Sequence, residues 1–228
     1  MIYAIGDLHL SNSVEKPMDV FGEAWTNHQA RIEQNWNQRV SPDDIVLIPG
    51  DISWAMTLDE AILDLKFVSG LPGTKVMIRG NHDYWWSGIS KVRAQLEDKL
   101  FAIQNDSFVA GNFVICGIRG WLLPGHPQFT TDDMRLLQRE AERLRLSLDH
   151  ADKTGLRKIC MIHYPPIGQN GEPTVFSELL ETYDVKVCVY GHLHGHTHRF
   201  AFEGVKNDVR YQLTSADYID FDPVEVRV

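Results

Sequence analysis

Five short hydrophobic runs along the 228-residue chain each end on a residue that can bind a metal ion or a phosphate group. They read "IYAIGD", "IVLIPGD", "VMIRGN", "ICMIH" and "VCVYGH". Each run has the length of a β-strand, and longer segments with helical spacing lie between them, which is typical of an α/β domain. Ligands of open α/β sheets bind in the crevice outside the carboxyl ends of the strands. We therefore expect the five ends to meet at one site.

The residues at these ends offer oxygen or imidazole nitrogen and no thiolate. They are Asp7, His9, Asp51, Asn81, His82, His163, His192 and His194. Such a set suits manganese, iron or zinc ions and does not suit a structural zinc site built on cysteines. Two carboxylates and at least four imidazoles exceed what one ion needs. The sequence therefore predicts a pair of metal ions, an arrangement found in phosphatases and nucleases, with Asp51 as the candidate bridging ligand because a carboxylate has two oxygens to share.

Glycine precedes four of the five end residues, at Gly6, Gly50, Gly80 and Gly191. Glycine permits an abrupt turn out of a strand and lets the backbone approach a bound ion or phosphate closely. This pattern favours a ligand site over ordinary strand termini.

His82 directly follows Asn81 and differs from the other histidines in its expected role. An imidazole that faces the substrate has a pKa suited to general acid work near neutral pH. The alternative is a histidine that only packs beside the ligands.

The order of the motifs "GDLH", "GD", "GNHD", "H" and "GHLH" resembles that of the calcineurin-like metallophosphoesterase superfamily. The motifs run from Asp7 to His194 and so cover most of the chain. The resemblance implies an α/β fold of four layers, an αββα sandwich with two mixed β-sheets flanked by helices, and a dinuclear metal site.

The resemblance also implies a role for each matching residue. One metal would be held by Asp7, His9, Asp51 and His194. The other would be held by Asp51, Asn81, His163 and His192. His82 would contact the phosphate and protonate the leaving oxygen.

Two positions leave the match open to interpretation. The stretch "GHLHGHTH" fits the last motif in two overlapping registers, and we choose His192 and His194 because they directly follow the strand. His196 and His198 then lie outside the ligand set and could orient ligands. Protein Ser/Thr phosphatases of this superfamily carry aspartate and arginine after the second motif, where this chain has "SWA". That difference argues against a protein phosphatase and leaves the carboxylate partner of His82 open, with Asp83 close in sequence.

Other segments fill in the predicted fold. Strands are expected at 2–5, 45–48, 75–78, 108–110, 113–117, 158–162 and 186–190, and further strands in the tail at "HRFAFEG", "VRYQLTS" and "VEVRV". Apolar residues at helical spacing predict helices over 21–36, 58–65 and 134–148. We expect one domain that spans residues 1–228, since a chain of this length with 43% hydrophobic residues can bury a single large core.

Charge and composition restrict the partners. The net charge of −9 disfavours a broad nucleic-acid surface, whereas a small phosphorylated substrate remains compatible with bound cations. No run approaches the roughly 20 apolar residues of a membrane span, so we expect a cytoplasmic protein with no membrane partner. The three cysteines lie in apolar runs and are expected to be buried, reduced thiols.

The expected function is that of a dinuclear metal-dependent phosphoesterase, a phosphoric ester hydrolase in which metal-bound hydroxide attacks a small phosphate ester. A phosphodiester is favoured, and manganese is the favoured metal, with iron or zinc as alternatives. The alternatives are a phosphomonoesterase with the same site and a metal-binding scaffold without activity. Tryptophans near the ligands could stack a nucleotide-like substrate or simply pack in the core, and Arg79, Arg119 and Lys91 are candidates for phosphate contact. The sequence leaves the oligomeric state open.

Overall fold

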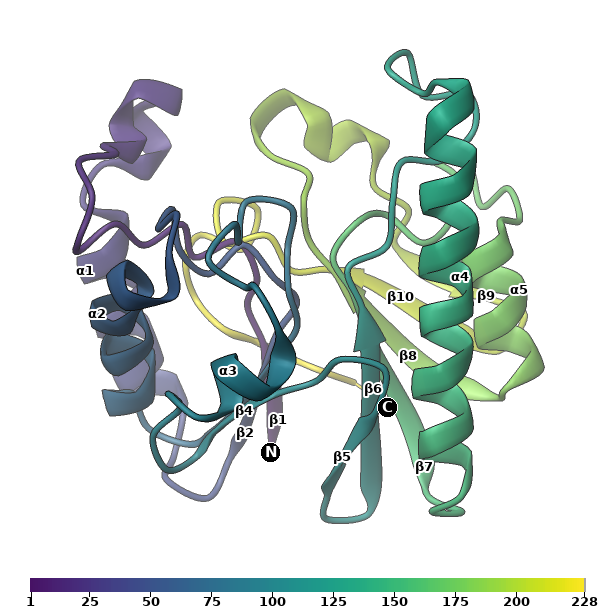
Figure 1. The fold of residues 1–228 in the computed structure, drawn as a ribbon, viewed down its shortest axis with the longest axis horizontal. Coiled ribbons are helices and arrows are strands. Elements are labelled where there is room, and N and C mark those ends of the chain that lie inside the picture. Colours follow the sequence, from purple (N-terminus) through teal and green to yellow (C-terminus); the bar gives the residue numbers. More distant parts are fainter. Residues whose placement is uncertain (228) are drawn as a thin grey trace.

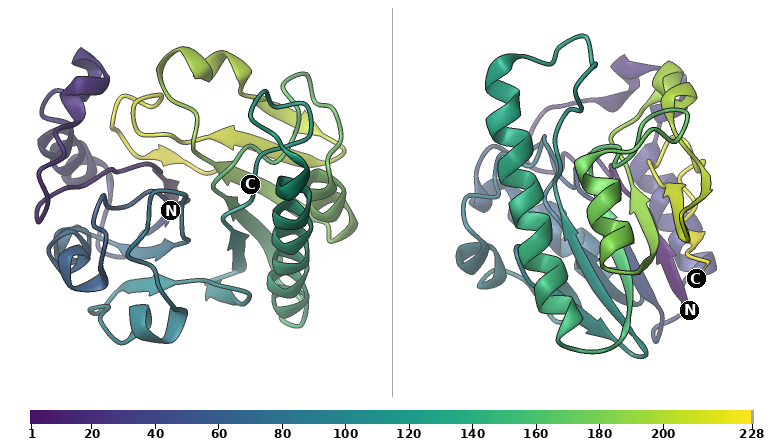
Figure 2. Two further views of the ribbon diagram at one scale, coloured as in Figure 1. Left: turned by 45° about the horizontal axis from the view of Figure 1, so that its top comes forward. Right: turned by 90° about the vertical axis from the view of Figure 1, so that its right-hand side faces the viewer.

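The computed structural model describes residues 1–227 and arranges them in four layers (Figure 1). Two β-sheets face each other in the middle of the molecule. Helices α1 (His28–Arg39) and α2 (Leu58–Gly70) cover the outside of one sheet, and α4 (Thr131–Asp152) and α5 (Val175–Thr182) cover the outside of the other. Figure 2 shows α4 and α5 side by side on their sheet. The expected αββα sandwich is confirmed.

Both sheets are mixed, as expected. The first sheet has the strand order β11-β1-β2-β3-β4, in which β11 alone is antiparallel to its neighbour. Its strands are β1 (Ile2–Ala4), β2 (Ile45–Ile48), β3 (Thr74–Met77), β4 (Leu100–Ala102) and β11 (Val224–Glu225). The short helix α3 (Ile89–Arg93) lies between β3 and β4 in the chain.

The second sheet has the order β5-β6-β7-β8-β10-β9, with four parallel central strands and antiparallel strands at both edges. Its strands are β5 (Ser107–Ala110), β6 (Phe113–Ile118), β7 (Arg157–Ile162), β8 (Val185–Tyr190), β9 (Gly204–Lys206) and β10 (Val209–Leu213).

Three separate hydrophobic clusters hold the four layers together. One lies between the first sheet and its helices, one between the two sheets, and one between the second sheet and α4 with α5. Along β7 the side chains alternate between two of them, since Ile159 and Met161 face the other sheet whereas Cys160 and Ile162 face the helices. Strands buried on both faces read as continuous apolar runs, which is why the five runs of the sequence contain almost no polar residue.

Some expected elements differ from the observed ones. The segment expected as one helix from residue 21 is interrupted at Gly22, whose φ of 132° is outside the helical region, so two 3-10 helices (Met18–Phe21 and Glu23–Trp25) precede α1. The segment "HRFAFEG" is not a strand except at its last residue, Gly204, where β9 begins, because a 3-10 helix (Gly195–Phe200) includes its first three residues. Of the strand expected at 224–228, β11 covers Val224–Glu225, and residue 228 lies outside the described residues.

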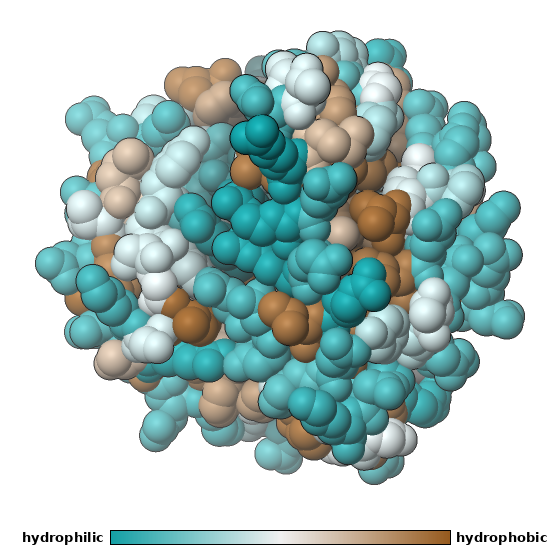
Figure 3. Space-filling view, turned by 45° about the vertical axis from the view of Figure 1, so that its right-hand side comes forward, coloured by the Kyte–Doolittle hydropathy of each residue, from teal (hydrophilic) through white to brown (hydrophobic). Residues whose placement is uncertain are grey.

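The surface is mixed in polarity, and the three cysteines are buried in the core. On the face shown in Figure 3, hydrophobic residues form small patches between hydrophilic ones. Cys116, Cys160 and Cys188 are buried and form no disulfide. They lie opposite one another on the neighbouring strands β6, β7 and β8. Among the described helices, none combines the length and the apolar character that a bilayer crossing needs.

Candidate metal centre

The eight site residues meet where the parallel strands of both sheets end. Hydrogen bonds between the exit loops fix this edge: the backbone N–H of Asp7 donates to Gly50 O (2.9 Å), that of His9 to Asp51 O (3.0 Å), and that of Gly191 to His163 O (3.1 Å). The parallel bridge between Gly6 and Ser215 joins the two sheets there. The strand ends therefore lie together at one edge, and both sheets contribute to it.

Asp7, His9 and His194 form a first group of candidate ligands. Each offers one ligand atom, and these atoms lie within 4.8 Å of one another. His194 Nε2 lies 3.4 Å from His9 Nε2 and 3.5 Å from Asp7 Oδ1. These short separations between lone-pair donors are what a shared cation would stabilise.

Asn81, His163 and His192 form a second group. The side-chain oxygen of Asn81 lies 2.6 Å from His163 Nε2 and 2.8 Å from His192 Nδ1. The other ring nitrogen of His163, Nδ1, lies 3.0 Å from Pro49 O, which leaves Nε2 facing the centre.

Asp51 lies between the two groups. Its Oδ2 is 3.8 Å from His9 Nε2 in the first group and 3.4 Å from His163 Nε2 in the second. Its Oδ1 accepts a hydrogen bond from the backbone N–H of His82 (2.7 Å). One carboxylate thus faces both candidate ligand groups.

Four of the candidate ligands have left-handed backbone conformations that residues other than glycine seldom adopt. Their φ angles are 56° at Asp7, 46° at His9, 52° at Asp51 and 72° at His192. Such strain persists only where the surrounding structure enforces it, and it concentrates at functional sites.

Two of the glycines before the ligands allow a close approach. A Cβ atom at Gly80 would lie 2.1 Å from Asp51 Oδ1, and one at Gly191 would lie 2.3 Å from Asp7 Oδ2. Because no side chain fits at these points, each carboxylate packs directly against the backbone of a neighbouring strand end. The glycine pattern predicts an approach of the backbone to an ion or phosphate, whereas the approach observed here is to the carboxylates of Asp51 and Asp7.

Burial keeps most of the imidazoles neutral. It lowers the pKa of His163 to about 4 and lowers the pKa values of His9 and His192 well below the usual range. Neutral imidazoles have a free lone pair, which is the form that binds metal ions. Burial together with the nearby Asp83 and Asp7 raises the pKa of Asp51.

His194 shows the opposite shift. Burial opposes its protonation, but the charge of Asp7 and a hydrogen bond with Asp217 raise the pKa of His194 to about 10. A proton on His194 therefore supplies positive charge beside a fully buried carboxylate. A divalent cation among these carboxylate, amide and imidazole donors would supply that charge instead, so the donor set fits the predicted metal ions.

Comparison with known proteins decides the family. Residues 1–196 match the calcineurin-like phosphoesterase family. The chain belongs to this family. Its members use divalent metal ions, and membership together with the observed ligand groups indicates a metal-dependent phosphoesterase.

Similar proteins extend over most of the chain. The Gene 66 protein of Mycobacterium phage L5 is 24% identical over 199 residues, which cover 85% of this chain and 80% of the phage protein. TT1561 of Thermus thermophilus has a similar fold, with a TM-score of 0.58 at 10% identity over 94% of this chain and 88% of its own. AQ665 from Aquifex aeolicus, a protein of unknown function, has a TM-score of 0.53 at 15% identity, covering 98% and 94%.

In this phosphoesterase, Asp83 does not pair with His82. Its buried carboxylate accepts hydrogen bonds from backbone N–H groups of four residues and from Trp85 Nε1. The backbone donors are Asp51, Ile52, Ser53 and Gly80. Asp83 therefore fixes the backbone that carries Asp51, and the candidate left open by the sequence has a positioning role instead.

Asp217 is a site residue that sequence reasoning missed. Its Oδ1 lies 2.8 Å from His194 Nδ1, and its Oδ2 lies 3.2 Å from His198 Nε2 and accepts from the backbone N–H of Gly195 (2.9 Å). His194, His198 and Asp217 each place one ligand atom within 4.8 Å of the others, so His198 lies beside a candidate ligand. The sequence did contain a signal, because Asp217 closely follows β10, another strand that runs parallel to its neighbour β8.

A cavity of about 840 Å³ opens beside the first ligand group. Its lining includes His9, His82, His194 and an apolar wall of Met18, Phe21, Trp25, Trp54 and Met56. Trp54 occupies the position where protein phosphatases differ from this chain, and its ring lies 4.4 Å from the His82 ring and 4.8 Å from the His9 ring. The Nδ1 of His82 is buried and has no hydrogen-bond partner within residues 1–227.

The other tryptophans and the cations proposed for substrate contact lie in different parts of the molecule. Trp85 and Trp86 belong to the core of the first sheet, so they pack there and do not line this cavity. Arg79 and Arg119 lie together in a second pocket at the same edge. Lys91 is exposed on α3 and lines neither of these two cavities.

Proposed function

We propose that this phosphoesterase is a dinuclear enzyme that hydrolyses small phosphodiesters. The observation that carries the proposal is the position of Asp51, one oxygen of which lies within 3.8 Å of nitrogen atoms from both candidate ligand groups. A carboxylate placed in this way can be shared by two cations. The two groups then have separate roles in holding one ion each.

In this proposal the ions are manganese, and each is held by four side chains. The first site uses Asp7, His9, Asp51 and His194, and the second uses Asp51, Asn81, His163 and His192. When bound, two divalent cations supply Lewis-acid activation of water and neutralise charge on the phosphoryl group.

His82 would protonate the leaving oxygen. Its ring lies beside His9 (5.7 Å between centroids) and lines the cavity next to the first ligand group. Burial lowers the pKa of His82, while the charge of Asp7 opposes that shift. An anionic phosphate in contact with the ring would favour its protonated form further. His82 could then transfer a proton from its ring to the departing alkoxide.

The apolar wall of the cavity supports a diester with an aromatic, nucleoside-like substituent. The Phe21 ring stacks on that of Trp54 (6.4 Å between centroids) and Phe21 is 59% exposed, so a planar group of the substrate could stack on Phe21. Such stacking contributes on the order of 1–3 kcal/mol per base.

Hydrolysis assays with added metal test the proposed reaction. The chain is stripped of metal, manganese is added back, and bis-p-nitrophenyl phosphate is compared with p-nitrophenyl phosphate. We expect manganese to restore activity with a preference for the diester. A preference for the monoester would overturn the diester assignment, and two bound metals without activity on either ester would favour a non-catalytic scaffold.

The variant His82→Ala tests the proposed acid. We expect hydrolysis to fall by roughly 100-fold or more with nearly unchanged metal content. His150→Ala is the matched control, because His150 is exposed on α4. Unchanged turnover in His82→Ala would exclude His82 from the mechanism.

A further inference from the structure

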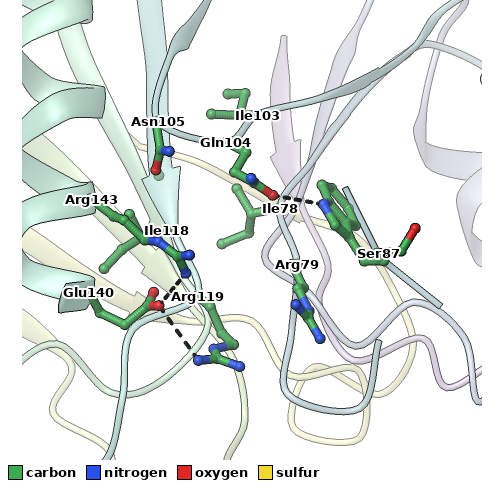
Figure 4. A pocket seen from close by; sticks show the side chains of 12 residues that line it. Ile78, Arg79, Ser87, Ile103, Gln104, Asn105, Ile118, Arg119, Glu140 and Arg143 are labelled. Atoms are coloured by element: carbon green, nitrogen blue, oxygen red, sulfur yellow. Dashed lines mark hydrogen bonds and ion pairs between the residues drawn. The ribbon is translucent and has the colours of Figure 1, made fainter. Parts of the chain in front are cut away.

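A second pocket lies at the same edge as the metal centre, between the strand ends of the two sheets. It encloses about 110 Å³, enough for a few water molecules or one tetrahedral oxyanion. Arg79 enters it from the end of β3, Arg119 from the end of β6, and Glu140 and Arg143 from α4 (Figure 4). We call it the arginine pocket.

The arginine pocket has an excess of positive charge. Its lining residues include three arginines, Arg79, Arg119 and Arg143, and one carboxylate, that of Glu140. Glu140 Oε1 lies 2.7 Å from Arg143 and 3.5 Å from Arg119. Both ion pairs leave out Arg79, the side chain of which extends beside that of Arg119 in Figure 4.

Several buried polar atoms of the pocket lack partners. The Nε atoms of Arg79 and Arg119 have no hydrogen-bond partner within residues 1–227, and neither does Glu140 Oε2. Buried charged donors without acceptors are unfavourable and rare in native proteins. A bound hydrogen phosphate group suits this lining, because its oxygens can accept hydrogen bonds from guanidinium groups and its P–OH can donate to the Glu140 carboxylate.

The pocket and the metal centre share their loops. Arg79 precedes the candidate ligand Asn81 by two residues. The backbone carbonyl of Arg119 accepts a hydrogen bond from Tyr164, the residue after His163 (3.0 Å). The same strand-exit loops therefore carry the pocket and the second ligand group, and no residue that lines the pocket also lines the apolar cavity.

We propose that the arginine pocket binds a phosphate-type oxyanion beside the metal centre, with Arg79 and Arg119 as its main donors. The occupant is either free inorganic phosphate or a distal phosphate group of a molecule bound at the centre. The second source rests on the proposed phosphodiesterase function, and the first does not.

Calorimetric titration of the manganese-loaded full chain with inorganic phosphate tests this site. We expect the wild type to bind one phosphate more per chain than either Arg79→Gln or Arg119→Gln. Each substitution should lower the affinity of the arginine pocket for phosphate about tenfold or more. Arg145→Gln is the matched control, because Arg145 is exposed on α4 and does not line the pocket. Equal stoichiometry in all four proteins would overturn the proposal.

The titration separates this proposal from that for the metal centre. If phosphate does not bind at the metal centre, the measured number of phosphates per chain is lower by one in every protein. The difference between the wild type and the variants remains. Because Arg119 pairs with the buried Glu140, its variant could fold poorly, and Arg79→Gln then decides the result.

A pair of substrates identifies the source of the oxyanion. We would compare thymidine 5′-(p-nitrophenyl phosphate) with the same ester that carries a 3′-phosphate. If the pocket binds a distal substrate phosphate, Arg79→Gln changes the ratio of the two KM values about tenfold. An unchanged ratio together with lost phosphate binding assigns the pocket to free phosphate.

Discussion

The Asp217 carboxylate links two histidines of the loop after β8 and thereby determines how His194 faces the metal centre. A hydrogen bond to Nδ1 fixes the ring orientation and leaves Nε2, which lies near Asp7 and His9, for a cation. Carboxylates that orient ligand histidines in this way raise their basicity and help select the metal. The pKa of Asp217 is lowered although burial opposes this, because the hydrogen bond with His194 favours the charged form.

We expect Asp217→Asn to reduce metal affinity by about 10–100-fold while the fold is retained. The amide has no negative charge to stabilise the His194 ring. Equilibrium dialysis against manganese, with circular dichroism as the check on folding, measures the effect. Asp220→Asn serves as the control, because its side chain is 90% exposed and pairs only with Arg31 at the surface. Equal metal affinity in both variants would contradict the orienting role.

At the same scale, sequence reasoning could find residues that directly follow strands and could not find those that act through another residue. Asp7, Asp51 and His163 follow apolar runs, and the structure brings them together. The role of Asp83 depends on four backbone N–H groups from two different loops, and no local pattern shows such contacts. The assignment of Asp7, Asp51 and His163 as metal ligands stays a prediction, whereas their proximity is observed.

At the scale of elements, the junction between a strand and its exit loop is the unit from which the site is built. Each junction combines a buried strand, a turn with little space for side chains, and a polar residue at the edge. Gly80 shows how tight the packing is, because its α-carbon lies against the Asp51 carboxylate.

We expect Gly80→Ala to displace the Asp51 carboxylate, since the added methyl group would lie 2.1 Å from Oδ1. The variant should lose metal binding and about 1–3 kcal/mol of unfolding free energy. Gly88→Ala is the matched control, because a Cβ atom there meets nothing within 4 Å. Urea unfolding and metal analysis of both variants measure the difference, and a Gly80→Ala protein with full metal content would refute the packing argument.

Elements with a strong pattern were predictable, and short or irregular ones were not. The long amphipathic α4 and the buried β7 and β8 were expected close to their observed bounds. The three-residue β4 and the short α5 went unpredicted because so few residues give a weak periodic signal. The interruption at Gly22 depends on one backbone angle, which spacing alone does not reveal.

At the scale of the whole molecule, the candidate metal ligands lie where the two sheets meet, beyond the hydrophobic cluster that packs between them. Asp7, Asp51 and Asn81 come from loops of the first sheet, whereas His163 and His192 come from the second. The αββα arrangement follows from the strand runs and the family resemblance together, because strands buried on both faces do not reveal which sheet they join. Cations bound between the sheets would add a connection that the unfolded chain lacks.

Removal of the metal ions should therefore lower the melting temperature of the whole domain. A ligand that binds only the folded chain stabilises it by about 2.7 kcal/mol per site at a concentration 100 times its Kd. For a chain of this length, each kcal/mol corresponds to a shift of about 2–4 °C. Calorimetry of the chelator-treated protein, before and after manganese is added back, measures the shift. Asp51→Asn should respond much less than wild type, because the carboxylate lost lies between both ligand groups, whereas His150→Ala should respond fully. A melting temperature that does not depend on manganese would show that cations do not hold the two sheets together.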